Sequence, residues 1–183
     1  MSIQTPHTRI YLLGMPASGK STLGKYLAEL INYECIDLDK QIETEQGATI
    51  AEIFEQKGED EFRKLEQRVL QQSFEWEHKV IATGGGTPCF FENMDKIKQH
   101  GFSIFLSVNP NELLKRIRRQ IHINRPIFQA QTDEELLADL VQRFEKRQFF
   151  YRQANMMVSA EDKNAKQLAL YLHDFFQRWK DNL

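Results

Sequence analysis

The chain has 183 residues, 41% of them hydrophobic and 27% charged, which is the composition of a single globular domain. It has no run of about 20 apolar residues that could span a membrane, and its N-terminus lacks the basic and then apolar pattern of a signal peptide. A net charge of −2, five scattered histidines and two distant cysteines argue against nucleic-acid binding and against a metal held by protein ligands alone. We therefore expect one cytoplasmic domain over residues 1–183, with no nucleic-acid or membrane partner.

Short apolar runs alternate with amphipathic stretches along the chain. The expected strands are residues 9–13, 33–36, 79–82, 103–108 and 156–159. The expected helices are residues 18–31, residues 49–76 with a break at Gly58, a helix opened by Pro110, a helix that ends near Tyr151, and residues 164–179. This alternation predicts an α/β fold in which helices cover both faces of a parallel sheet. Such sheets bind ligands at the carboxyl ends of their strands.

The first expected strand is followed by Gly14-Met-Pro-Ala-Ser-Gly19-Lys20-Ser21 and then by a helix. This sequence fits the G-x-x-x-x-G-K-S/T pattern of a phosphate-binding loop in its required strand–loop–helix setting, which argues against a chance glycine-rich turn. Backbone amides and the helix amino end would surround phosphate oxygens, Lys20 would reach the β and γ phosphates, and the Ser21 hydroxyl would ligate Mg²⁺. The nucleotide-binding residues expected here are Gly14, Ala17, Ser18, Gly19, Lys20, Ser21 and Thr22.

Nucleotide binding alone does not identify the reaction. The chain contains neither the N-K-x-D nor the D-x-x-G motif of a GTP-binding switch, and residues 79–82 do not end in the acid typical of an ATPase motor. Asp37 and Asp39 follow an expected strand and, two residues apart in an extended segment, would share one face. One could serve Mg²⁺ while the other meets an acceptor hydroxyl. A polar strand exit whose second aspartate caps the next helix is an equally good interpretation.

Residues 58–66, Gly-Glu-Asp-Glu-Phe-Arg-Lys-Leu-Glu, lie within the long helical region. Phe54 and Phe62 are eight residues apart and so fall on nearly the same helix face. Arg63 and Glu66 are three residues apart, so they can form a contact that fixes the direction of the arginine. Taken alone, this pattern favours a core stripe with a solvated ion pair over a substrate site.

Two further segments lie where ligands are expected. Gly84, Gly85 and Gly86 follow the strand at residues 79–82, where bare backbone lets a ligand approach closely, although a flexible turn is the alternative. Residues 120–133 form a polar segment with Arg125, which suits a mobile lid that brings an arginine to the phosphates. Arg147 lies late in the next helix.

In their order along the chain, the segments GMPASGKST, Asp37-Leu-Asp39, GEDEFRKLE, ATGGG, NRPIF and Arg147 followed by Tyr151 resemble the shikimate kinase family over about residues 9–175. The resemblance implies a P-loop kinase fold of three α/β/α layers around a five-stranded parallel sheet, with a small mobile lid at about residues 120–132 and an acceptor-binding helical region at about residues 39–76. It also implies a monomer that transfers the γ-phosphoryl group of ATP to the 3-hydroxyl of shikimate, in the route to chorismate and the aromatic amino acids.

The resemblance further implies a role for each matching residue. Lys20, Asp39 and Arg125 would be catalytic, with Asp39 orienting or deprotonating the attacking hydroxyl. ATP would also contact Arg118 and Arg125, and Mg²⁺ would contact Ser21 and Asp37. The shikimate-binding residues implied are Asp39, Arg63, Gly84, Gly85, Gly86, Arg147, Phe54 and Phe62. Two arginines at the acceptor site suit an anionic acceptor better than a neutral sugar.

The chain departs from the family pattern at two places. Phe149 stands where relatives commonly have proline, and residues 87–91, Thr-Pro-Cys-Phe-Phe, replace an aliphatic run. Two other functions stay open: another small-molecule kinase of this fold, such as a gluconate or nucleoside monophosphate kinase, and a non-catalytic nucleotide-binding regulator. The regulator is disfavoured because every charged position of the pattern is filled.

Overall fold

The computed structural model of the protein describes residues 8–121, 132–161 and 163–181. Its elements follow one another in the order β1 (Arg9–Leu13), α1 (Lys20–Ile31), β2 (Glu34–Asp37), α2 (Leu38–Gln46), α3 (Ile50–Gln72), η1 (Ser73–Glu75), β3 (Lys79–Ala82), η2 (Thr87–Cys89), α4 (Asn93–His100), β4 (Phe102–Ser107), α5 (Pro110–Ile121), α6 (Asp133–Tyr151), β5 (Met156–Ser159) and α7 (Ala165–Asp181). The expected strands are all present, with bounds that differ by at most one residue at either end.

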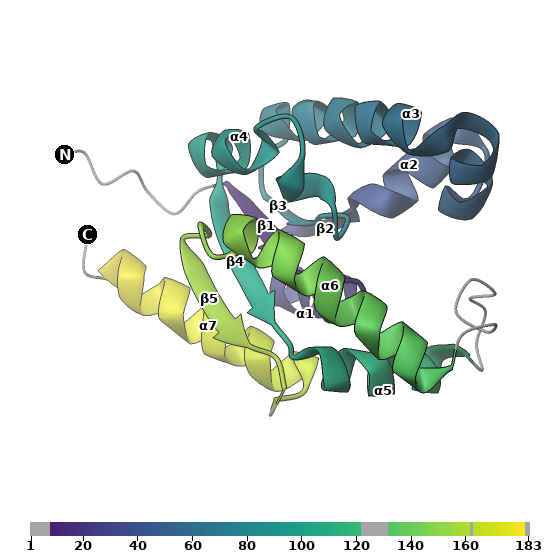
Figure 1. The fold of residues 1–183 in the computed structure, drawn as a ribbon. Helices are drawn as coiled ribbons and strands as arrows, with labels where there is room; N and C mark the ends of the chain where they lie inside the picture. Colours follow the sequence, from purple (N-terminus) through teal and green to yellow (C-terminus); the bar gives the residue numbers. More distant parts are fainter. Residues whose placement is uncertain (1–7, 122–131, 162, 182–183) are drawn as a thin grey trace.

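The five strands form one parallel sheet in the order β2-β3-β1-β4-β5, which confirms the expected architecture (Figure 1). The central register pairs Leu12 of β1 with Ala82 of β3 and with Ile104 of β4. Right-handed crossovers place α1 and α7 on one face, where they pack against each other, and α3, α4 and α6 on the other. Because β1 and β3 are neighbours, the loops that leave their carboxyl ends lie side by side.

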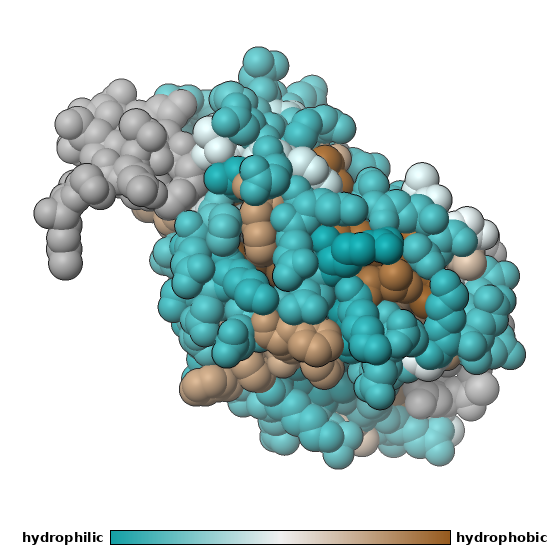
Figure 2. Space-filling view, turned by 90° about the horizontal axis from the view of Figure 1, so that it is seen from above, coloured by the Kyte–Doolittle hydropathy of each residue, from teal (hydrophilic) through white to brown (hydrophobic). Residues whose placement is uncertain are grey.

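The core is centred on the middle strands of the sheet. Residues Ile10–Leu13 of β1 are at most 4% exposed, since a central parallel strand is covered on both faces and is therefore almost continuously apolar. The outer faces of the helices are polar. The view from above shows a largely hydrophilic surface in which apolar residues appear in small groups (Figure 2).

The long helical region before β3 is interrupted at Gly58, as the sequence predicts. Thr49 and Glu52 form a reciprocal capping box at the start of α3, and Gly58 then interrupts this helix with φ 79° and ψ 174°. That backbone conformation is essentially restricted to glycine, so the predicted break is confirmed. The short helix α4 had no counterpart among the expected elements, because its eight residues follow a loop with no recognisable capping sequence.

The expected lid falls on residues that are mostly outside the described ranges, and so does Arg125. Helix α5 ends at Ile121 before this segment, and α6 begins after it at Asp133, where Thr132 and Glu135 form a second capping box. No helix within the described ranges is both long and apolar enough to cross a membrane.

Gly101 lies at the junction of α4 and β4, against the core strand β1. A methyl group at this position would come within 2.6 Å of the buried Tyr11 ring and 2.8 Å of the Arg9 carbonyl oxygen. We expect Gly101→Ala to lower the free energy of unfolding by about 1–3 kcal/mol, the usual cost of overpacking, as measured by urea denaturation. Gln99→Ala, on the exposed face of α4, should change it by less than about 0.5 kcal/mol. An unaltered urea midpoint for Gly101→Ala would show that the junction has spare room.

Candidate active site

The loop between β1 and α1 has the backbone of a phosphate cradle. Gly14, Ala17 and Gly19 all have positive φ angles, of 142°, 63° and 98°. A side chain at Gly14 would lie 2.8 Å from the carbonyl oxygen of Leu106, so glycine is required there by both conformation and space. The Oγ of Ser18 is buried and has no hydrogen-bond partner among the described residues, which fits a hydroxyl that meets a ligand oxygen.

Lys20 begins α1 and is only 8% exposed. Its Nζ donates to the carbonyl oxygens of Gly14 and Met15, both at 2.9 Å, so the ammonium group lies across the loop that precedes it. A lysine at this position can exchange these carbonyl acceptors for phosphate oxygens by rotating its side chain. These contacts place Lys20 at the loop between β1 and α1, and its role toward phosphate stays a prediction.

Ser21 and Asp37 are brought together at the carboxyl end of β2. The Ser21 hydroxyl donates to Asp37 Oδ2, and Asp37 Oδ1 accepts from the backbone amide of Asp39 at 3.1 Å. Asp37 therefore caps α2. The sequence predicted a helix cap here but assigned it to Asp39, the second aspartate, whereas the structure assigns it to the first.

A hydroxyl beside a carboxylate, as at Ser21 and Asp37, offers the oxygen ligands that Mg²⁺ prefers. Among the described residues, no group of three or more His, Cys, Asp or Glu side chains could hold a metal by itself.

Asp39 points toward the glycine loop that follows β3. Its Oδ1 would lie 2.7 Å from a side-chain carbon placed at Gly84. Burial, followed by the negative charges of Glu66 and Asp37, raises the pKa of Asp39 to about 6, although Lys20 opposes this shift. Near neutral pH the carboxylate is thus mostly ionised but close to protonation, as suits a group that accepts a hydrogen bond or a proton from a hydroxyl.

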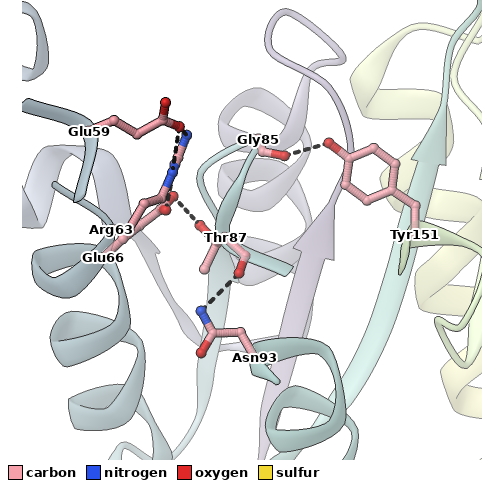
Figure 3. A network of polar contacts seen from close by, with 7 residues as sticks. All are labelled: Glu59, Arg63, Glu66, Gly85, Thr87, Asn93 and Tyr151. Carbon is pink, nitrogen blue, oxygen red and sulfur yellow. Dashed lines mark hydrogen bonds and ion pairs between the residues drawn. The ribbon is translucent and has the colours of Figure 1, made fainter. Parts of the chain in front are cut away.

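Arg63 is held by two carboxylates of its own helix (Figure 3). Its Nη1 donates to Glu66 Oε2 at 2.7 Å, while Nε and Nη2 both donate to Glu59 Oε1 at 3.1 and 2.8 Å. Glu66 is 1% exposed, so this pair is not the solvated surface bridge that the local sequence favoured. Burial lowers the pKa of Arg63, but Glu66 and Glu59 outweigh it and raise the pKa, so the guanidinium stays charged.

The network continues from Glu66 into the glycine loop. Thr87 donates from Oγ1 to Glu66 Oε1 at 2.6 Å, and its carbonyl accepts from Asn93 Nδ2 at 2.9 Å (Figure 3). Thr87 and Asn93 are both buried. These bonds connect α3, η2 and α4, and they fix the loop that carries the glycines relative to Arg63.

Arg147 reaches the same loop from α6. A side-chain carbon at Gly85 would lie 3.3 Å from Arg147 Nη1, and the Tyr151 hydroxyl donates to the Gly85 carbonyl oxygen at 2.5 Å. Burial raises the pKa of Tyr151, so its hydroxyl keeps its proton. The sequence placed Arg147 near Tyr151, and the structure shows both beside the same glycine.

The three glycines make room for these charged groups. A side chain at Gly84 would collide with Asp39, one at Gly86 would lie 2.6 Å from Arg63 Nη1, and one at Gly85 would lie 2.7 Å from Cδ of Pro16 in the phosphate loop. The bare backbone therefore lies close both to the predicted acceptor residues and to the phosphate loop. The rings of Phe54 and Phe62 are tilted against each other with 4.5 Å between their centroids, and both lie within 6 Å of the guanidinium carbon of Arg63.

The basic end of α5 contains three arginines, of which Arg116 and Arg118 have different surroundings. Arg118 lies at the surface, where its Nε donates to Asp133 Oδ1 at 2.6 Å. Arg116 instead donates to the carbonyl oxygens of Ser18 and Ala160, and so links the phosphate loop to the residue after β5. Both arginines therefore have protein partners, so these contacts do not choose between them, and Arg118 stays the predicted contact of the nucleotide.

Three residues of this site were not singled out from the sequence: Glu59, Thr87 and Phe90. The spacing of four between Glu59 and Arg63 is a recognisable helical ion-pair signal, so this contact could have been found. Thr87 and Phe90 meet α3 through tertiary contacts only, and no local pattern indicates such contacts.

Comparison with known proteins places these features in a family. A profile described as shikimate kinase matches residues 16–177. The shikimate kinase of Bacteroides fragilis is 46% identical over 153 residues, which cover 84% of this chain and 85% of that protein.

Solved structures agree with the sequence comparison. The shikimate kinase of Bacteroides thetaiotaomicron superimposes with a TM-score of 0.86 at 38% identity, covering 93% of this chain and 98% of that one. The shikimate kinase of Acinetobacter baumannii, solved in complex with shikimate, superimposes with a TM-score of 0.83 at 35% identity over 95% of each chain. The chain therefore belongs to the shikimate kinase family, and its activity is that of this family of ATP-dependent kinases.

Proposed function

We propose that the protein binds ATP with Mg²⁺ at the phosphate loop and shikimate at the triple glycine, and that it transfers the γ-phosphoryl group to the 3-hydroxyl of shikimate. One observation carries this assignment of sites. A side-chain carbon at Gly85 would lie 2.7 Å from Cδ of Pro16 in the phosphate loop and 3.3 Å from Nη1 of Arg147, so the proposed donor and acceptor sites would meet at this glycine.

The acceptor site suits a small ring acid with several hydroxyls. Arg63 and Arg147 offer planar guanidinium groups for its carboxylate, and the amides of the glycine loop offer further donors. Asp39, near the opposite end of this loop, would accept a hydrogen bond from the attacking hydroxyl. The neighbouring rings of Phe54 and Phe62 would cover the apolar part of the acceptor ring.

Transfer would then proceed by positioning and charge stabilisation. Asp39 orients the hydroxyl and takes its proton as the oxygen bonds to the γ-phosphorus, while the bond to the β-phosphate oxygen breaks and ADP leaves. Lys20 moves from its carbonyl acceptors to the phosphates and offsets their charge. Mg²⁺, held by Ser21 and by Asp37 with the phosphates, would neutralise the transferring group. Arg125 of the lid is assigned to the γ-phosphate and Arg118 to the adenine.

We also propose that the enzyme acts as a cytoplasmic monomer of one domain, with the lid at about residues 120–132. Asp39, Arg63, Arg147 and the glycine loop all come from one chain, so these parts of the site need no second copy. Cys35 and Cys89 are both free thiols, as is usual in a reducing compartment.

The substrate assignment is tested by acceptor-dependent release of ADP. We expect shikimate to support turnover and gluconate, AMP and CMP to give only the background rate. AMP and CMP have no carboxylate for the arginine pair, and the flexible open chain of gluconate does not hold its carboxylate and a hydroxyl at the fixed separation that a ring acid provides. Lys20→Ala should fold and lose turnover, which controls for contaminating kinases. Equal turnover with gluconate or a nucleotide would reassign the acceptor, and nucleotide binding without turnover for any acceptor would favour the regulator.

Removal of either acceptor arginine should affect shikimate and spare ATP. We expect Arg63→Ala or Arg147→Ala to weaken shikimate binding by about 2–5 kcal/mol, the usual loss when one member of a buried charge pair is removed, with little change in the Kd of ATP. Calorimetric titration measures both. Arg68→Ala is the matched control, since Arg68 lies on α3 but pairs with Glu45 at the surface. An equal loss of ATP affinity would mean that these arginines are misassigned.

The raised pKa of Asp39 predicts a pH dependence of shikimate binding. Below about pH 6 the carboxyl becomes protonated and loses its strength as a hydrogen-bond acceptor, so binding to the nucleotide-free protein should weaken as pH falls through this value. Calorimetry between pH 5 and 8 checks this, and Asp39→Asn, which has no ionisable group there, should lack the transition. The same transition in Asp39→Asn would assign it to another residue.

A further inference from the structure

The ring of Phe90 lies over the guanidinium of Arg63. The Cζ atom of Arg63 is 4.4 Å from the Phe90 ring centroid, closer than it is to the rings of Phe62 at 5.2 Å or Phe54 at 5.8 Å. All three distances are within the range of about 6 Å in which an aromatic face attracts a cation. The Arg63 side chain is only 10% exposed, so water competes little with these contacts.

We propose that Phe90 is a positioning residue for the acceptor: its ring holds the plane of the Arg63 guanidinium in the orientation that receives the substrate carboxylate. This inference rests on the proposed function of Arg63. The bonds to Glu59 and Glu66 restrain the guanidinium along its N–H directions, whereas an aromatic face restrains rotation of its plane. Planar recognition of a carboxylate requires both restraints.

The backbone around Phe90 is fixed on both sides. Upstream, the amide of Cys89 donates to the Gly86 carbonyl oxygen at 2.9 Å, and downstream the amide of Asn93 donates to the Phe90 carbonyl oxygen at 2.9 Å. Phe91 and Glu92 then adopt left-handed conformations, with φ of 51° and 58°. Two consecutive non-glycine residues in this region persist only where the surrounding contacts determine the chain path, so Phe90 does not depend on a flexible loop for its position.

The contacts also determine how the effect of Phe90 should appear. A phenyl ring offers no hydrogen bond to a carboxylate and no group for proton transfer, and the contact described here is with Arg63. Its loss should therefore weaken acceptor binding and leave the chemical step nearly unchanged. A purely structural residue would instead lower the amount of folded enzyme and leave KM unaltered.

Steady-state kinetics of Phe90→Leu test this role. We expect the KM for shikimate to rise about tenfold, equivalent to about 1.4 kcal/mol, with kcat within twofold and the KM for ATP unaltered. Phe90→Tyr should restore the KM to within about twofold, because it restores an aromatic face. Phe91→Leu, one residue further along and 45% exposed, is the matched control and should leave the KM unaltered. If Phe90→Leu does not fold, Phe90→Met replaces it, with the same expected result.

A double-substitution cycle separates this inference from the function on which it rests. In the Arg63→Ala background, Phe90→Leu should add less than a twofold rise in KM, because the group that the ring positions is gone. An unaltered KM in Phe90→Leu, or a tenfold effect that persists in the Arg63→Ala background, would overturn the role of Phe90. An unaltered KM in Arg63→Ala itself would instead refute the acceptor role of Arg63, and the proposed function with it.

Discussion

The site depends on the absence of side chains at three successive positions after β3. Asp39 from α2, Arg63 from α3 and Arg147 from α6 come from three different helices, and they approach the same stretch of backbone because Gly84, Gly85 and Gly86 leave it bare. The same stretch touches the phosphate loop, since β1 and β3 are neighbours in the parallel sheet. The strand order thus brings the proposed nucleotide site beside the proposed acceptor site, and the absence of side chains at the three glycines leaves room between them.

The positive and negative side chains around the glycine loop are paired with one another. Arg63 has two carboxylate partners, of which Glu66 is buried and Glu59 is exposed, so the guanidinium remains charged without substrate. The buried Glu66 is in turn satisfied by both Arg63 and Thr87. Its negative charge also raises the pKa of Asp39. The Glu66 carboxylate therefore acts on both ends of the proposed acceptor site. It orients Arg63, and it raises the pKa of Asp39 toward the pH range in which this aspartate can take up a proton.

The sequence predicted well those features that local chemistry determines. The phosphate loop, the strand bounds and the Gly58 break follow from glycine positions and hydrophobic periodicity, and the Arg63–Glu66 pair follows from helical spacing. The choice between structural and functional interpretations of Asp37 and Asp39 could not be made locally, because Asp37 also meets Ser21 of α1 and Asp39 points toward the loop after β3, and the local sequence indicates neither contact. Phe90 and Thr87 were missed for the same reason: their partners lie more than twenty residues away.

The most direct test of this account is a crystal structure of the protein with ADP and shikimate. The account predicts that the shikimate carboxylate lies within hydrogen-bond distance of the guanidinium groups of Arg63 and Arg147, and that the 3-hydroxyl lies beside Asp39 and faces the phosphate loop. A shikimate molecule bound with its carboxylate away from both arginines, or with Asp39 remote from any hydroxyl, would contradict it.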